Sequence, residues 1–133
     1  MLVYKVRMPD GVAARTDGKD IWIDDRLNPI QEKCAIEHEL EHVRQGHSTV
    51  QVEAVEMQVR YTVARRLLPD SGIGSCTGST LAQVARGLGV TRQVLMDRAA
   101  TLTDEETVRA GCLSCRLCPI IDARYPAKQY ANA

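Results

Sequence analysis

Apolar and polar residues alternate over residues 2–7, as expected of a strand that buries one face. A second β-rich run, Ile21-Trp22-Ile23, ends at a pair of aspartates. Two turn sequences, Pro9-Asp10-Gly11 and Asp17-Gly18, lie between these runs. We therefore expect residues 2–23 to form two or three antiparallel strands.

A helix is predicted directly after these strands. Asn28 can cap its N-terminus, Pro29 suits its first turn, and Gln31 completes a capping box. Gly46 is a typical residue just beyond a helix C-terminus. Between these limits, three apolar residues recur at helical spacing and predict the face that packs on the core: Ile36, Leu40 and Val43.

A second helix is expected over residues 49–68, because Pro69-Asp70 cannot continue it. An apolar stripe at helical spacing runs along its length: Val52, Val55, Val59, Val63 and Leu67. Together with the strands, these two helices predict an α+β core over residues 1–70.

Three further segments complete the expected organisation. Residues 71–80 are rich in glycine and serine and are expected to form a linker. Residues 81–111 are expected to form a helical unit of the helix–turn–helix type, with Gly89-Val90 as its turn and a capping box opening at Thr103. Residues 112–133 form a cysteine-rich C-terminal segment.

Candidate chemistry is concentrated on the first predicted helix, where His38-Glu39-Leu40-Glu41-His42 has the form H-E-x-x-H. Residues four apart lie on one face of a helix, about one turn from each other, so both imidazoles can bind one metal ion. Glu39 lies beside them, where a carboxylate can take a proton from a metal-bound water. The alternative is a solvated helix face on which the same residues are ordinary polar surface.

A third metal ligand is expected from the second helix. Glu56 falls within the apolar stripe, and a buried carboxylate requires a cationic partner. That partner is either a divalent metal or a nearby arginine: Arg60, Arg65 or Arg66. Glu53 lies at the edge of the stripe, and the choice between Glu56 and Glu53 stays open. Two histidines and a glutamate leave a fourth position open, as a catalytic zinc ion requires.

The third histidine of the chain, His47, follows His42 by five residues. The long metzincin motif requires a spacing of six residues between its second and third histidines. We therefore expect His47 to be an exposed residue near the site or a substrate contact, and not a ligand.

The 17 basic and 17 acidic residues are in balance, which gives no global attraction to nucleic acid or anionic membranes. Within residues 80–98, Arg92 and Gln93 are candidate DNA contacts, together with Thr91 and Asp97. This stretch has three arginines and no lysine, which is little positive charge for binding the phosphates of DNA. A helical hairpin that packs on the core is therefore favoured over a DNA-reading unit.

Three of the five cysteines, Cys112, Cys115 and Cys118, are separated by two residues each. Such thiols can bind a second, structural zinc ion, with Cys76 or Cys34 as the fourth ligand. The alternatives are free thiols, an adventitious disulfide, or an iron–sulfur cluster, for which a further cysteine is missing. The N-terminus has no apolar core of a signal peptide, and no apolar run approaches a membrane span. We expect a cytoplasmic protein with no membrane partner.

The order of these motifs resembles the ImmA/IrrE family of zinc metallopeptidases over roughly residues 20–100. Three stretches carry the resemblance: Ile21-Trp22-Ile23-Asp24 with Leu27-Asn28-Pro29 and Cys34 to His42; Glu56 with Ala64-Arg65 and Leu67-Leu68-Pro69; and Leu88-Gly89-Val90-Thr91 with Leu95 and Arg98. The resemblance implies a gluzincin-like zinc site with His38, His42 and Glu56 as ligands and Glu39 as general base. It also implies an origin in a phage or mobile element, and a DNA-bound transcriptional repressor as the protein substrate. Glu41 stands where many members carry glycine, and the cysteine cluster is outside the family pattern.

The sequence thus predicts a small zinc metallo-endopeptidase of the host cytoplasm, with a peptide substrate added to the edge of the Ile21–Ile23 strand. The rival hypothesis is a DNA-binding or protein-interaction regulator on the same scaffold with a non-catalytic zinc. The substrate, the cleavage site, the native metal and the oligomeric state stay open.

Overall fold

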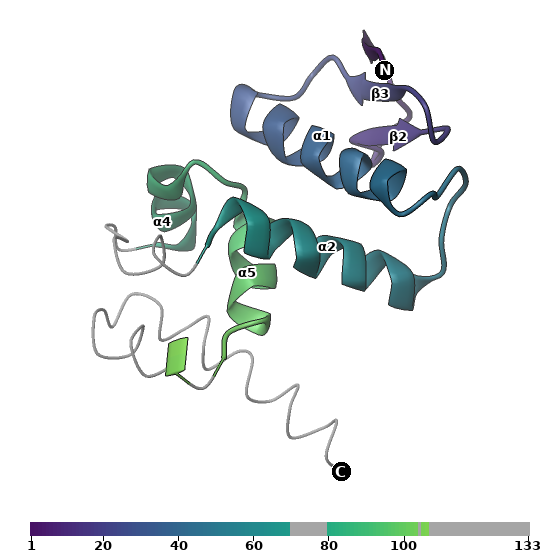
Figure 1. Ribbon diagram of the computed structural model, residues 1–133. Coiled ribbons are helices and arrows are strands. Elements are labelled where there is room, and N and C mark those ends of the chain that lie inside the picture. The colour runs from purple at the N-terminus through teal and green to yellow at the C-terminus, as the bar shows by residue number, and fades with distance from the viewer. Residues whose placement is uncertain (70–79, 104, 107–133) are drawn as a thin grey trace. The chain divides into compact units, whose positions relative to one another are not determined.

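The computed structural model describes residues 1–69, 80–103 and 105–106 (Figure 1). The described residues form an α+β protein with one small sheet, which confirms the predicted fold class. Its elements, in chain order, are β1 (Val3–Val6), β2 (Ala14–Thr16), β3 (Ile21–Asp24), α1 (Pro29–Arg44), α2 (Glu53–Leu67), α4 (Leu81–Leu88) and α5 (Arg92–Ala100). The chain divides into two compact units, Met1–Val63 and the residues from Ala64 onward, with the division inside α2. The linker expected at residues 71–80 lies almost entirely outside the described residues.

The sheet has the strand order β1-β3-β2, with β3 in the centre. β2 and β3 form an antiparallel hairpin, whereas β1 pairs parallel to β3, so the prediction of an antiparallel sheet is wrong for β1. The hairpin follows from local turn chemistry: the Asp17 carboxylate accepts the amides of Lys19 and Asp20, and Gly18 has φ +93°. The residues near β1 do not determine its partner strand or its direction, because β1 pairs with β3, which is distant in the sequence.

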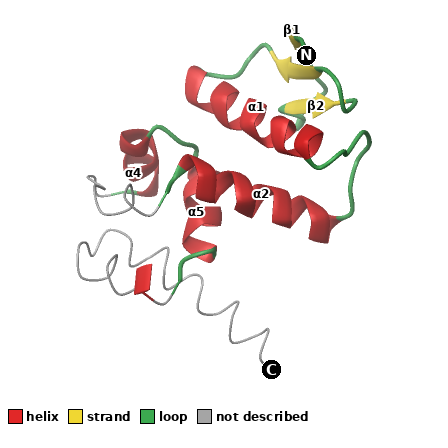
Figure 2. Cartoon of the chain, in the orientation of Figure 1, coloured by secondary structure: helices red, strands yellow, loops and turns green. Residues whose placement is uncertain are grey.

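Helix α1 packs against β2 and β3 (Figure 2). Ile21 and Ile23 of β3 are fully buried and point to one face of the sheet, since alternate residues of a strand share a face. On the other face Trp22 stacks on Tyr4 with 5.6 Å between the ring centroids. The side chains of Ile21 and Ile23 are therefore the part of the sheet that belongs to the core, whereas all four residues of β1 are exposed.

The predicted ends of α1 are confirmed. Asn28 Oδ1 accepts the amide of Gln31 at 2.8 Å, and the Gln31 side chain accepts the amide of Asn28 at 3.0 Å. The helix ends at Arg44, and Gly46 adopts the left-handed conformation with φ +77°. Both ends are set by side chains and backbone angles within a few residues, which is why sequence patterns locate them.

The predicted packing face of α1 is wrong. Ile36, Leu40 and Val43 are only half-buried, whereas the buried residues of this helix are mostly polar: Cys34, Glu39, Glu41 and His42. The carboxylate of Glu41, which stands where many members of the resembled family carry glycine, is buried and accepts a hydrogen bond from Gln45. Two residues of the H-E-x-x-H motif, Glu39 and His42, are therefore among the buried residues of this helix.

Helix α2 begins at Glu53, later than the expected start at residue 49, and ends at Leu67, shortly before Pro69. Its apolar stripe is buried at Val59 and Val63, but Val52 lies before the helix and is 70% exposed. The stripe therefore packs only in the C-terminal half of the predicted helix. The N-terminal end of α2 is left free to carry polar side chains.

In the second unit, α4 and α5 are joined by a tight turn at Gly89, which has φ +71° and follows α4 as its C-cap. Thr91 caps α5 by accepting the amide of Val94. The buried residues of this unit are mainly small and aliphatic: Ala64, Leu68, Val84, Ala85, Val90, Val94, Leu95, Ala99 and Leu102. The predicted hairpin of two short helices is present; a role in reading DNA is a separate question.

Arg98 is a buried cation of the second unit. Its guanidinium donates to the Leu68 carbonyl at 2.6 Å, to the Thr101 hydroxyl at 3.3 Å, and to both carboxylate oxygens of Glu106. Glu106 also forms the predicted capping box with Thr103. The cysteines Cys76, Cys112, Cys115 and Cys118 lie outside the described residues, so the predicted second metal site stays a prediction. Among the described helices, none has both the length and the apolar character needed to cross a membrane.

Candidate metal centre

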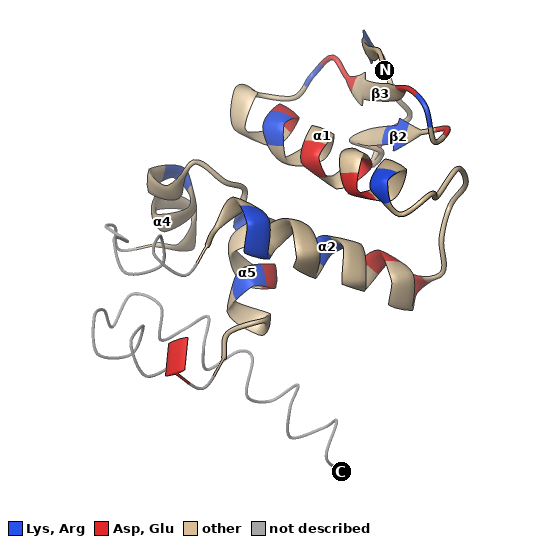
Figure 3. Cartoon of the chain, in the orientation of Figure 1, with Lys and Arg blue, Asp and Glu red and all other residues tan. Residues whose placement is uncertain are grey.

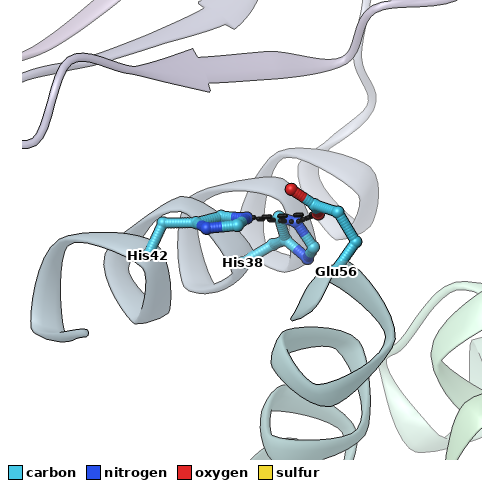
Figure 4. Close-up of side chains that lie close together, drawn as sticks. All are labelled: His38, His42 and Glu56. Atoms are coloured by element: carbon cyan, nitrogen blue, oxygen red, sulfur yellow. Dashed lines mark hydrogen bonds and ion pairs between the residues drawn. The ribbon is translucent and has the colours of Figure 1, made fainter. Parts of the chain in front are cut away.

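His38 and His42 lie one turn apart on α1, and Glu56 approaches them from the first turns of α2 (Figure 4). The Nε2 atoms of the two histidines are 3.1 Å apart. Glu56 Oε2 lies 3.3 Å from Nε2 of His38 and 3.2 Å from Nε2 of His42. These three residues are the metal ligands expected from the sequence, and the structure brings them together. Glu53, the other candidate, is exposed at the start of α2.

The triangle of donor atoms has the dimensions of a zinc site. Because zinc binds nitrogen and oxygen at about 2.0–2.1 Å, two ligand atoms of a tetrahedral zinc ion lie about 3.3 Å apart. The three observed separations of 3.1, 3.2 and 3.3 Å match one triangular face of such a tetrahedron. The donor set therefore fits zinc and leaves the fourth position open.

Hydrogen bonds alone do not account for this cluster. A neutral imidazole has one N–H, and an ionised carboxylate has none, so a closed triangle of two imidazole nitrogens and one carboxylate oxygen cannot pair every contact through protons. One cation bound to all three atoms removes this conflict. In the part of the chain that the structure describes, no other three His, Cys, Asp or Glu residues bring their ligand atoms within 4.8 Å of one another.

The site is open on one side. The His42 side chain is 6% exposed, whereas those of His38 and Glu56 are 25% and 31% exposed. They line a cavity of about 760 Å³, whose other walls come from residues 11–16, residues 48–50, Ala35 and Glu39. A ligand or substrate can therefore reach the open position of the metal site from solvent.

Glu39 lines this cavity and is 9% exposed. Burial raises the pKa of its carboxyl group to about 7, the negative charge of Glu56 adds to this rise, and the positive charge of Arg15 opposes it. A dication at the three ligand atoms would lower the pKa of Glu39, because a nearby positive charge favours the carboxylate. With a dication bound, Glu39 would therefore be ionised, which is the form that can accept a proton.

The environment of His38 favours its neutral form. Burial lowers the pKa of His38, and the neighbouring His42 lowers it further, while Glu56 acts in the opposite direction. Neutral imidazole is the form that offers a lone pair to a metal ion. Burial therefore prepares this side chain for its expected role as a ligand.

His47 is closer to the site than its sequence position predicted. Its Nδ1 lies 3.0 Å from Nδ1 of His42, and the residue is half-buried. The predicted place of His47 near the site is confirmed, but the residue is half-buried and not exposed, and its ring contacts a metal-ligand candidate directly. A sequence signal exists: His47 follows Gly46, and a glycine after a helix turns the next residue back toward the last helical turn.

The predicted docking of a peptide along Ile21–Ile23 is wrong, because β3 is the central strand and is paired on both sides. The cavity is lined instead by a continuous run of residues from Gly11 to Thr16, which includes β2. Side chains of a strand alternate between two faces, so a continuous run meets the cavity with its backbone edge. Among the described strands, β2 is paired only with β3, and its other edge is free.

The residues of β2 that face its free edge follow from the ladder. The amide of Asp24 donates to the carbonyl of Ala13 at 2.8 Å, which makes this a hydrogen-bonded pair of the antiparallel ladder. Such pairs alternate along the strand, so the peptide groups of Ala14 and Thr16 point away from β3. These groups are available to an added strand.

The candidate DNA contacts on α5 are only partly exposed. Arg92 and Gln93 are exposed, although the Gln93 amide donates to Asp97. Asp97 is buried, and so is Arg98, one of the three arginines counted in this stretch. Helices α4 and α5 carry isolated charged positions and no basic stripe (Figure 3). This stretch therefore exposes fewer positive charges than the sequence indicated.

No protein-family model, no curated protein and no solved structure matches this chain.

Proposed function

We propose that this protein is a zinc-dependent peptidase in which Glu39 acts as the general base. The observation that carries the proposal is the triangle formed by His38, His42 and Glu56, with the dimensions of a zinc site and an open cavity in front of it. The neighbouring carboxyl group of Glu39, which lines the same cavity, is the second element that hydrolysis needs. This combination supports a hydrolytic site better than a structural one, because structural zinc sites use all four positions.

In this proposal the metal ligands, Glu39 and Arg15 have different roles in hydrolysis. His38, His42 and Glu56 would hold zinc, which supplies an acidified water and polarises a carbonyl when bound. The Glu39 carboxylate accepts the proton of the attacking water and passes it to the amine that leaves as the peptide bond breaks. Arg15, which lines the same cavity, supplies positive charge on the β2 side of the site.

The substrate we propose is an extended peptide segment that adds to the free edge of β2. Peptide groups of Ala14 and Thr16 would bind its backbone, as in other cases of strand addition. A segment held in this way runs along the wall that faces the metal ligands. The sequence resemblance to ImmA/IrrE metallopeptidases suggests a phage or mobile-element transcriptional repressor as the protein that contains this segment.

The test combines metal analysis with a search for cleavage. Freshly purified wild type, His38→Ala and Glu39→Gln are analysed for zinc, and each is incubated with a library of synthetic peptides whose products are identified by mass spectrometry. We expect one zinc in the wild type and in Glu39→Gln, none at this site in His38→Ala, and new peptide termini with the wild type only.

Two results would contradict the proposal in different ways. A wild type that binds no zinc, or binds it equally after His38→Ala, removes the metal centre. Zinc at the site without cleavage of any peptide or of candidate repressors favours the rival function, a regulator with a non-catalytic zinc.

A further inference from the structure

We propose that His47 is a positioning residue of the metal centre, which holds His42 in the tautomer that presents Nε2 to the ion. This inference rests on the proposed metal site and adds a residue that does not itself bind the metal. Metal-binding histidines usually donate their second ring N–H to a carboxylate, a carbonyl or water. In this chain the partner is another imidazole.

The geometry assigns the protons of both rings. If Nε2 of His42 offers its lone pair to a metal, the neutral ring carries its proton on Nδ1. That N–H then donates to Nδ1 of His47, which lies 3.0 Å away. As an acceptor at Nδ1, the neutral ring of His47 must carry its own proton on Nε2. One hydrogen bond therefore determines the tautomers of two histidines.

The end of α1 delivers His47 to this position. The amide of Gly46 donates to the carbonyl of Val43, and the amide of His47 donates to the carbonyl of His42. This is the Schellman arrangement, which requires a left-handed residue; Gly46 supplies it with φ +77°. The same arrangement usually brings two apolar side chains together, and here it brings the rings of His42 and His47 to a centroid distance of 5.2 Å.

The turn between β2 and β3 packs against the same segment. A Cβ atom added at Gly18 would lie 3.2 Å from Cβ of Ser48 and 3.4 Å from the carbonyl oxygen of His47. This turn therefore lies directly on the backbone that carries His47. The position of the imidazole is supported both by the helix end and by the sheet.

Three substitutions of His47 separate the hydrogen bond from simple packing. His47→Asn keeps an acceptor, since Oδ1 of asparagine has the same bonded position as Nδ1 of histidine. His47→Asp offers a carboxylate, the commonest partner of metal-binding histidines. His47→Leu keeps a side chain of similar bulk and has no acceptor.

The readout is the zinc dissociation constant, measured by competition with a chromophoric chelator on the full chain. We expect His47→Leu to weaken zinc binding about 10- to 100-fold, the usual effect of losing such a partner. His47→Asn and His47→Asp should stay within a few-fold of the wild type. Equal affinities in all variants, or equal losses in His47→Leu and His47→Asn, would overturn the inference.

Nuclear magnetic resonance of the zinc-loaded wild type with ¹⁵N-labelled histidine tests the tautomers directly, and the chain has only three histidines to assign. We expect the proton of His47 on Nε2 and that of His42 on Nδ1. A proton on Nδ1 of His47 would overturn the inference while leaving the metal site intact. If the wild type binds no zinc through His38, the proposed function fails and the role of His47 fails with it.

Discussion

The two units of the chain each contain a cluster of polar side chains, buried in the second unit and partly exposed in the first, and the clusters differ in how their atoms are paired. In the second unit, the guanidinium of Arg98 donates to Glu106, Thr101 and the Leu68 carbonyl. In the first unit, the triangle of His38, His42 and Glu56 brings together atoms that mainly offer lone pairs. The Arg98 cluster pairs its donors with acceptors of the chain itself, whereas the triangle in the first unit would require a cation, as we propose, to pair all its atoms.

The comparison shows why burial of polar groups is not by itself a sign of function. A buried charge is costly in both units, but the Arg98 cluster removes that cost with donors and acceptors of its own. Its effect is on stability. The candidate metal centre keeps its lone pairs close together and opens onto a cavity, which supports our proposal that it binds a ligand.

The largest effect on folding is expected from Arg98→Met. This change leaves the Glu106 carboxylate buried without its partner, which costs about 3–5 kcal/mol in comparable pairs. The measurement is the free energy of unfolding in urea, with Arg92→Met, an exposed arginine of the same helix, as the control expected within about 0.5 kcal/mol of the wild type. Adding Glu106→Leu to Arg98→Met should recover much of the loss. Equal stability of the two single variants would contradict the role of this pair.

Acid should weaken the same pair in a defined range of pH. Burial alone would raise the pKa of Glu106, but the hydrogen bonds from Arg98 and Thr103 and the positive charge of Arg98 together outweigh it and hold the pKa at about 2, below the ordinary value of 4.5. The stabilisation is therefore complete above pH 4.5 and is lost as the pH falls from 4.5 toward 2. Melting temperatures of the wild type and Glu106→Gln should differ most at neutral pH and converge near pH 2. A constant difference across this range would show that the charge of Glu106 contributes nothing.

Zinc should stabilise the first cluster, and only while its ligands are present. At a free zinc concentration 100 times the dissociation constant, the wild type should gain about 2.7 kcal/mol in its free energy of unfolding. His38→Ala should gain none, and in the presence of a chelator it should unfold at nearly the same urea concentration as the wild type. An equal gain in both proteins would place the zinc elsewhere in the chain.

The smallest effect is expected at the free edge of β2. Ala14→Pro removes an amide that points away from β3 and keeps the ladder to β3, since proline is tolerated on edge strands. Loss of one hydrogen bond to a bound peptide should lower kcat/KM about tenfold, at unchanged zinc affinity. Ala14→Val, which keeps the amide, is the control. Equal losses in both variants would argue against docking by strand addition.

Features encoded within a few residues were predicted well. The capping boxes at Asn28 and Thr103 and the end of α1 before Gly46 are as expected, because each depends on contacts between near neighbours. The convergence of His38 and His42 follows from the helical repeat alone. The place of Glu56 next to them required the two helices to pack, and the sequence left it open against Glu53.

Features that depend on distant partners were missed. β1 pairs parallel to β3 and not with β2, the strand that follows it in the chain, and the turn at Pro9-Asp10-Gly11 does not specify which strand β1 pairs with. The apolar residues of α1 did not predict its buried positions, because Glu39, Glu41 and His42 are buried whereas the apolar residues are only half-buried. Helical periodicity shows that a helix has two faces; it does not show which face a distant element will cover.

The sequence by itself determined the local parts of this protein: where α1 begins and ends, and the H-E-x-x-H repeat that aligns two imidazoles. Tertiary structure alone decided which glutamate joins them, which strand edge faces the cavity, and that His47 contacts His42. The physical reason is the range of the interactions. Capping and helical repeat act over a few residues, whereas a metal site with a third ligand on another helix exists only once segments far apart in the chain have packed.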